Sequence, residues 1–174
     1  MNLFIPDIYV KNVFNLDFKK LKDNGIKCIL FDLDNTLALI SEDKPSNEVK
    51  DLFARIDDLN MKAIIVSNSR KQRVAPFKEL LNVDSAYMSM KPLRHKYNKI
   101  LKMYKYDVSE VAAVGDQILT DVLGANKVGI TSIFVDKLSH EDKIFTKINR
   151  KIEKMILKRL NKKGIYEKGK YYGN

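Results

Sequence analysis

Short apolar runs alternate along this chain with longer segments in which apolar residues recur every three or four positions. A period of three to four predicts an amphipathic helix, whereas a short continuous apolar run predicts a buried strand. The predicted strands are 27–31, 62–67, 85–90, 111–114 and 130–135, of which 85–90 has the weakest pattern. The predicted helices lie around 49–59, with Ser46 as N-cap, and at 70–81, 95–104 and 120–126. Residues 1–25 are predicted to form short helical pieces that lead into the core.

This alternation predicts an α/β fold. Strands that are apolar on both faces belong to a parallel sheet that helices cover on each side. Right-handed crossovers then produce a doubly wound, three-layer α/β/α sandwich of the Rossmann-like type. The length of 174 residues suits one domain. We assign residues 1–136 to the core with its N-terminal lead-in, and residues 137–174 to a basic helix and tail of the same domain.

Polar residues follow the predicted strands at the points where the strands end. Ligands in such folds bind beyond the carboxyl ends of the strands, so these positions are candidates for chemistry. They are Asp32 and Asp34 after the first strand, Ser67 and Asn68 after the second, Lys91 after the weak strand, and Asp116 and Asp121 after the next.

The residue types at these positions favour phosphate chemistry at a metal ion. Two carboxylates two positions apart stay ionised near neutral pH only if a cation lies between them. Four carboxylates without His or Cys describe a site for a hard cation, for which Mg²⁺ is the expected occupant. Ser67 and Lys91 suit the oxygens of a phosphoryl group, and a carboxylate can attack phosphorus while a second one transfers the proton. The simpler interpretation, that Asp and Asn cap helices and form turns, accounts for single residues but not for the ordered set.

The set of motifs resembles the haloacid dehalogenase superfamily of phosphatases, with its four motifs in order. The wording FDLDNTL, SNS, KP and GDQILTD is similar to the YqeG-type subfamily of the class IIIA phosphatases, whose mitochondrial and plastid members act on phosphatidylglycerophosphate. The resemblance covers residues 5–136. It implies a phosphatase that works through an aspartyl-phosphate intermediate, with phosphatidylglycerophosphate as the leading substrate.

The resemblance also implies a role for each motif residue. Asp32 is the expected nucleophile and Asp34 the general acid and base. Ser67 and Asn68 are expected to bind the substrate phosphate, together with Lys91, which also neutralises charge on the nucleophile.

The expected metal ligands overlap with these catalytic residues. By the same resemblance, Mg²⁺ is held by the Asp32 carboxylate, the Asp34 backbone carbonyl and Asp116. Asp121 is expected to support the metal indirectly, through a water molecule or through contact with a residue that binds the metal.

The gaps between the motifs leave no room for a substantial cap domain. Residues 37–61 are enough for a loop and one helix, and residues 69–90 for one helix and one strand. We therefore expect an open site, which suits a phosphate that is presented on a large molecule such as a lipid at a bilayer, a nucleic acid end or a protein.

Composition restricts the protein class further. The apolar runs are far shorter than the ~20 residues of a membrane-spanning helix, and the N-terminus does not have the pattern of a secretory signal. Cys28 is the only cysteine, so neither disulfides nor a cysteine zinc site is expected. These observations favour a cytoplasmic protein, with peripheral attachment to the membrane as a further possibility.

Basic charge is concentrated at the end of the chain. Residues 137–174 hold 12 Lys and Arg against four Asp and Glu, which gives +8 of the total net charge of +10. The apolar positions of the predicted helix there are Phe145, Ile148, Ile152, Ile156 and Leu160. Such a helix either packs on the core with a solvated basic face or lies on an anionic membrane.

Two other functions remain open at this point. A nucleotide or nucleic acid 3′-end phosphatase would use the basic tail to follow phosphates, although Tyr166, Tyr171 and Tyr172 are the only aromatic residues near it for base stacking. A non-catalytic regulatory module that accepts a phosphoryl group would use similar residues. Its phosphorylated Asp should follow the third strand, however, whereas here Asp32 follows the first clear one. A phospholipid substrate is therefore favoured over nucleic acid.

Overall fold

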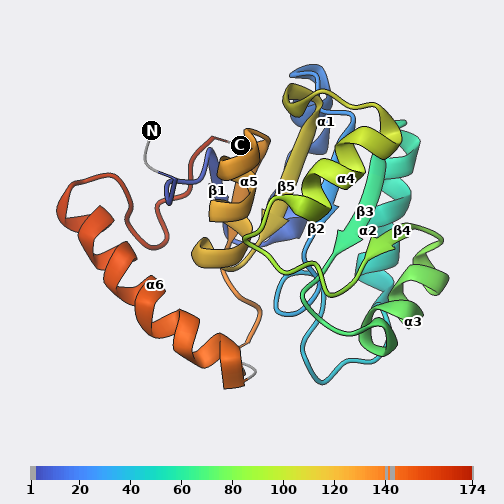
Figure 1. Ribbon diagram of the computed structural model, residues 1–174. Helices are drawn as coiled ribbons and strands as arrows, with labels where there is room; N and C mark the ends of the chain where they lie inside the picture. Colours follow the sequence, from blue (N-terminus) through green and yellow to red (C-terminus); the bar gives the residue numbers. More distant parts are fainter. Residues whose placement is uncertain (1–2, 140, 142–143, 174) are drawn as a thin grey trace.

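The computed structural model describes residues 3–139, 141 and 144–173, with the side chains of 144–148 left out of the description. Within these residues the chain forms one six-stranded sheet in which every neighbouring pair of strands is parallel. The strands lie in the order β1-β6-β5-β2-β3-β4 (Figure 1). Their bounds are β1 Ile8–Val10, β2 Cys28–Phe31, β3 Lys62–Val66, β4 Asp84–Ala86, β5 Val111–Gly115 and β6 Thr131–Val135. The predicted parallel α/β fold is therefore confirmed.

Helices cover both faces of this sheet. One face is covered by α1 (Phe18–Asp23), α2 (Asn47–Asp58) and α3 (Lys71–Leu81), which contribute to the largest hydrophobic cluster. The other face is covered by α4 (His95–Tyr104) and α5 (Leu123–Val128), which form a second cluster. The side chains of β2 alternate between the two, because Ile29 and Phe31 belong to the first cluster and Cys28 and Leu30 to the second. The predicted N-cap of α2 is also present, with the Ser46 hydroxyl accepting from the Val49 N–H at 3.2 Å.

The N-terminal segment differs from its prediction. Residues Ile8–Val10 form β1, an edge strand paired with β6, before a short 3₁₀ turn (Val13–Asn15) and α1. Its outer edge pairs with the end of the chain, since Tyr9 and Tyr172 exchange two backbone hydrogen bonds of 2.9 Å. A run of three residues is too short for a strand to be distinguished from a helix by periodicity.

The start of α5 also differs from its prediction. The segment expected as a helix over 120–126 begins earlier, with a π-helical turn at Ile118–Val122 that leads directly into α5. Asp121 lies in this turn and is buried.

The C-terminal helix α6 (Ile144–Lys162) packs beside the sheet edge on a face that agrees only in part with the predicted one (Figure 1). The buried positions are Glu153 and Leu160, with Ile156 and Leu157 partly buried between them. Ile152, which was predicted on the packed face, is 41% exposed. Ile156 and Leu160 are on the packed face as predicted, whereas Glu153 takes the place expected for Ile152. The side chains of Phe145 and Ile148 lie outside the described residues.

The segments between the motifs are as short as the sequence predicts. Residues 37–61 hold only a loop and α2, and residues 69–90 hold α3, β4 and their connections. Neither segment contains a cap domain. In the part of the chain that the structure describes, no helix is both long and apolar enough to cross a bilayer.

Candidate active site

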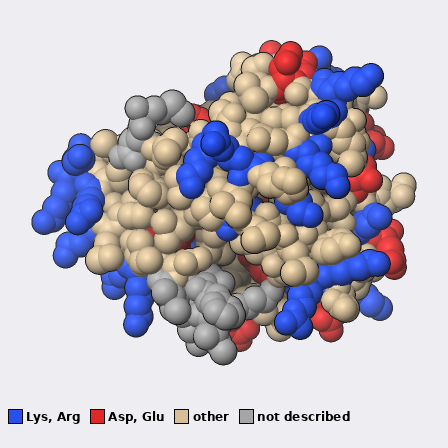
Figure 2. Space-filling model, viewed as in Figure 1, with Lys and Arg blue, Asp and Glu red and all other residues tan. Residues whose placement is uncertain are grey.

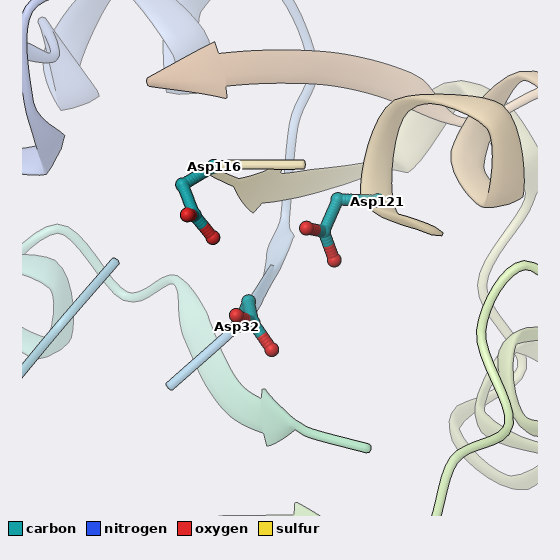
Figure 3. Close-up of side chains that lie close together, drawn as sticks. All are labelled: Asp32, Asp116 and Asp121. Atoms are coloured by element: carbon teal, nitrogen blue, oxygen red, sulfur yellow. The ribbon is translucent and has the colours of Figure 1, made fainter. Parts of the chain in front are cut away.

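Three carboxylates converge at the carboxyl ends of the two central strands. Asp32 follows β2, Asp116 follows β5, and Asp121 projects back from the π-helical turn (Figure 3). One oxygen from each carboxylate lies within 4.8 Å of the other two, and all three residues are at most 6% exposed. Because neighbouring parallel strands end at the same edge, residues more than 80 positions apart in sequence meet here.

Gly115 makes this close approach possible. A Cβ atom at this position would overlap the Asp121 carboxylate. The glycine at the end of β5 therefore lets the turn carry Asp121 back over the strand end, next to Asp32 and Asp116.

Lys91 joins two of the three carboxylates. Its Nζ lies 2.6 Å from an oxygen of Asp32 and 2.6 Å from an oxygen of Asp121. The other oxygen of Asp121 accepts from the Gln117 N–H at 3.1 Å and from the Thr120 hydroxyl at 3.3 Å. Burial lowers the pKa of Lys91, but Asp121 and Asp32 outweigh this effect and hold it above its usual value. The lysine is therefore a fixed, charged neighbour of Asp32.

Burial dominates the electrostatics of the other carboxylates. Loss of solvent raises the pKa of Asp32 to about 6, although Lys91 opposes the shift. Burial also raises the pKa of Asp116 to about 8, against the effect of Arg150. Repulsion from the neighbouring carboxylates adds a smaller upward contribution to the pKa of both residues.

Asp34 lies outside this cluster and has its own partners. Its carboxylate accepts from the Ser69 hydroxyl at 2.6 Å and from Arg73 Nε at 2.9 Å. Arg73 is held in turn by the backbone carbonyls of Leu39 (2.9 Å) and Glu42. Arg73 comes from the first turn of α3, so this helix fixes the position of the Asp34 carboxylate.

Ser67 and Asn68 complete the wall opposite the carboxylates. The Ser67 hydroxyl accepts from the Ser69 N–H at 3.1 Å. The Asn68 side chain binds the backbone of Lys91, with its oxygen 2.8 Å from the Lys91 N and its nitrogen 3.3 Å from the Lys91 carbonyl. Asn68 thus ties the β3 turn to the lysine. These side chains face a cavity of about 580 Å³. Its lining includes Ser67, Asn68, Lys91, Asp32, Asp34 and Arg73.

Sequence reasoning missed the contribution of α6 to this site. Arg150 donates to the Asp116 backbone carbonyl at 2.7 Å and also contacts the Asp116 carboxylate. Glu153 accepts from Arg150 at 2.9 Å and from the Leu119 N–H at 3.0 Å. Glu153 is the only acidic residue in 144–162, three positions after Arg150. A single acidic residue on a basic helix could have indicated a buried ion pair with Arg150. No feature of the sequence distinguishes Arg73 from other surface cations.

The donor set fits a divalent cation. Three buried carboxylates meet only two cationic side chains, Lys91 and Arg150, among the described residues. Carboxylate oxygens without His or Cys are the ligands of hard cations such as Mg²⁺. All seven residues predicted from the sequence line this strand edge. Asp32, Asp116, Asp121 and Lys91 form one ionic cluster, and Asp34 lies apart with Arg73.

Comparison of the sequence with known proteins identifies the family of this chain. The family model described as "Mitochondrial PGP phosphatase" matches residues 1–138. The chain belongs to this family. Among its relatives, the probable phosphatase YqeG of Bacillus subtilis (strain 168) is 35% identical over 161 residues, which are 92% of this chain and 94% of that protein. The chloroplastic/mitochondrial phosphatidylglycerophosphate phosphatase 1 of Arabidopsis thaliana is 29% identical over 92% of this chain and 49% of its own length.

Solved structures show the same fold. A Legionella pneumophila protein assigned to the HAD superfamily, subfamily III A, superposes with a TM-score of 0.54 at 18% identity, over 85% of this chain and 90% of its own. The cobalt-bound deoxy-D-mannose-octulosonate 8-phosphate phosphatase of Haemophilus influenzae gives 0.55 at 14% identity, over 85% and 95%. This member of the PGP phosphatase family is thus a phosphatase. Its fold is that of a solved protein assigned to the HAD superfamily.

Proposed function

We propose that this protein is a Mg²⁺-dependent phosphomonoesterase that converts phosphatidylglycerophosphate to phosphatidylglycerol through an aspartyl-phosphate on Asp32. The observation that carries the proposal is the position of Asp32, which lies at the floor of the cavity against Lys91 while Asp34 stands beside the same cavity with separate partners. Two carboxylates in different surroundings suit two different tasks.

The proposed reaction has two displacements at phosphorus. An Asp32 oxygen attacks phosphorus, and the ester P–O bond breaks as Asp34 protonates the leaving oxygen. Asp34 then takes a proton from water, whose oxygen attacks phosphorus, so that inorganic phosphate leaves and the Asp32 carboxylate is restored. Lys91, Ser67 and the side chain of Asn68 provide donors on the side of the transferred group.

The proposed metal ligands are the carboxylates of Asp32 and Asp116 and the backbone carbonyl of Asp34. When bound, Mg²⁺ supplies positive charge that stabilises the phosphoryl oxygens in the transition state. Asp121 accepts from Lys91, Gln117 and Thr120. We therefore propose that Asp121 positions Lys91 and supports the metal site indirectly, without binding the metal itself.

The lipid substrate is supported by the relatives and by the architecture. Two relatives carry phosphatidylglycerophosphate in their names, and the family is described as PGP phosphatase. Without a cap domain, the cavity is accessible to a headgroup that stays attached to a bilayer. Contact between the membrane and the basic helix α6, whose Lys and Arg side chains stand out at the left of Figure 2, stays a prediction, as does a cytoplasmic location.

The tail tyrosines do not favour a nucleic acid substrate. The rings of Tyr166, Tyr171 and Tyr172 lie 4.9–6.1 Å from the ring of Tyr9. They pack around Tyr9 on the edge strand β1, so these rings contribute to the packing of the domain. They do not form a platform on which bases could stack.

A phosphate-release screen tests the proposed function. Wild-type protein is incubated with Mg²⁺ and either phosphatidylglycerophosphate in detergent micelles, nucleotides, 3′-phosphorylated oligonucleotides or sugar phosphates, with EDTA as control. We expect the highest kcat/KM with the phospholipid and no release in EDTA. A higher kcat/KM with nucleotides or oligonucleotides would replace the proposed substrate, and a stable phosphoprotein without turnover would favour a regulatory module.

A further inference from the structure

Four large apolar side chains are exposed on one segment that borders the cavity. We define the rim segment as residues 87–93, between β4 and α4. Within it Tyr87 is 40% exposed, Met88 58%, Met90 66% and Leu93 52%. Scattered exposed apolar residues are common on soluble proteins, but four within seven positions beside a binding cavity indicate a contact surface.

The rim segment alternates between the site and the solvent. Ser89 and Lys91 are 1% and 7% exposed, and Lys91 reaches Asp32. The intervening Met88 and Met90 are turned outward, and both adopt a positive φ, of 45° and 56°. Such angles are unfavourable for residues other than glycine, and they persist where the surrounding structure enforces them. The same stretch therefore directs Lys91 into the cavity, buries Ser89 against the Ala86 carbonyl, and leaves the two methionines exposed.

The backbone of the rim segment is bound tightly to the phosphate side of the site. The Met88 N–H donates to the Ser69 carbonyl at 2.9 Å and the Ser89 N–H to the Ser67 carbonyl at 3.0 Å. Asn68 holds the Lys91 backbone from the same turn. Whatever binds the outward methionines is thereby fixed in position relative to Ser67 and Lys91.

The stretch of sequence that contains the rim segment and α4 is positively charged. Residues 85–106 contain six Lys and Arg and no Asp or Glu. Two of these, Arg94 and Lys96, follow the rim segment directly, and Figure 2 shows blue side chains over the part of the surface where α4 lies. Apolar side chains flanked by cations complement the headgroup region of an anionic bilayer, which accepts apolar groups and attracts basic ones.

We propose that the rim segment docks on an anionic membrane, with Met88, Met90 and Leu93 in the headgroup region and Arg94 and Lys96 against lipid phosphates. This inference rests on the proposed phospholipid substrate and adds the surface through which the site meets it. Docking in this way presents the cavity to a headgroup without extraction of the lipid. The membrane contact then lies at the site rather than on α6.

Tryptophan fluorescence tests the docking, because the chain contains no tryptophan. Met90→Trp places a probe on the rim segment, Met155→Trp on the outer side of α6, where Met155 is 59% exposed, and Met103→Trp on α4 as a matched control, where Met103 is 60% exposed. Each variant is mixed with vesicles of equimolar phosphatidylglycerol and phosphatidylcholine, with and without brominated lipid. We expect a blue shift and bromine quenching for Met90→Trp, and neither for Met155→Trp or Met103→Trp.

A second measurement uses vesicle co-sedimentation. Met88→Ser/Met90→Ser removes the apolar contacts, and we expect it to bind the same vesicles about tenfold more weakly than wild type. Ile152→Ser/Met155→Ser, on α6, should bind like wild type. Thermal melting confirms that each variant is folded.

Several outcomes would overturn the docking. One is a fluorescence blue shift that occurs only in Met155→Trp, and another is the absence of vesicle binding by wild type. A third is a blue shift of Met90→Trp that depends on protein concentration alone, which would identify a second copy of the chain as the occupant of this surface. Hydrolysis of phosphatidylglycerophosphate in micelles, measured separately, distinguishes the two proposals. If the lipid is hydrolysed but Met90→Trp does not respond to vesicles, the docking is wrong and the function stands. If Met90→Trp responds and the lipid is not hydrolysed, the docking stands and the substrate is wrong.

Discussion

Arg150 binds Asp116 twice, through the backbone carbonyl and through the carboxylate, although the two residues are 34 positions apart and lie on different elements. Asp116 is a proposed Mg²⁺ ligand with a pKa raised to about 8 by burial. Arg150 opposes that shift and contacts one oxygen of the Asp116 carboxylate. The C-terminal helix therefore supports the metal site from outside.

We predict that Arg150→Ala weakens Mg²⁺ activation by about tenfold or more, as is typical when the partner of a metal ligand is removed. Without the guanidinium the proton on Asp116 is held more tightly, so the defect should be larger at pH 6 than at pH 8.5. Mg²⁺ titrations of activity at both pH values measure this effect. Arg150→Lys should recover part of it, and Lys151→Ala, at an exposed neighbour, should behave like wild type. Identical Mg²⁺ dependence in Arg150→Ala would reduce this residue to a packing role.

Metal-free protein should lose stability as the pH rises from about 4 to about 8. Asp32 and Asp116 bind protons more tightly when folded than when unfolded, since their pKa values are raised to about 6 and about 8. Their contribution therefore favours the folded state below pH 4 and declines through that window. Saturating Mg²⁺ should raise the Tm by about 5–10 °C at pH 8 and much less at pH 5.

Asp116→Asn is the matched variant for this experiment. It removes one titrating carboxylate, so without metal its Tm should fall less steeply between pH 5 and pH 8 than that of wild type, while its response to Mg²⁺ should be lost. Thermal melts in EDTA and in Mg²⁺ measure both quantities. A Mg²⁺ response that is equal at pH 5 and pH 8 would contradict the assignment of these carboxylates as ligands.

Gly115→Ala should lower the rate of catalysis strongly while the protein remains folded. The added methyl group overlaps the Asp121 carboxylate, which must move away from Lys91. Displacement of a charged group by about 1 Å typically costs on the order of 10²-fold in rate. Gly129→Ala is the control, because Gly129 has φ 89° and open space around its Cβ position. That variant should be less stable by roughly 1–2 kcal/mol but active. Equal activities in the two variants would argue against a catalytic role for the Asp121–Lys91 pair.

Asp32, Ser67 and Asp116 could be predicted because each directly follows a buried strand, and parallel strands bring their ends together. Lys91 and Asp121 lie several residues beyond β4 and β5 and were predicted from their motifs. The residues contributed by α3 and α6 could not be predicted. Arg73 and Arg150 resemble ordinary surface cations until the fold brings them to Asp34 and Asp116. The packed face of α6 was wrong at Ile152 for a related reason, since apolar periodicity cannot anticipate that Glu153 is buried by its pairing with Arg150 and the Leu119 N–H.

The two proposed catalytic carboxylates should fail differently. Asp32→Asn removes the nucleophile, so neither phosphoprotein nor product should form from a soluble aryl phosphate. Asp34→Asn keeps the nucleophile but slows proton transfer by ~10²–10⁴-fold. It should accumulate phosphoprotein, because an aryl leaving group needs little protonation while the water attack still needs a base. Intact-protein mass spectrometry after acid quench separates the two, and phosphoprotein in Asp32→Asn would exclude Asp32 as the acceptor.

Phosphate release from phosphatidylglycerophosphate in Mg²⁺, by wild type beside Asp32→Asn, tests the central claim most directly. We predict that wild type releases inorganic phosphate and leaves phosphatidylglycerol, that EDTA stops the reaction, and that Asp32→Asn releases no more phosphate than buffer alone. Release by Asp32→Asn at the wild-type rate, or no release by folded wild type, would contradict the account.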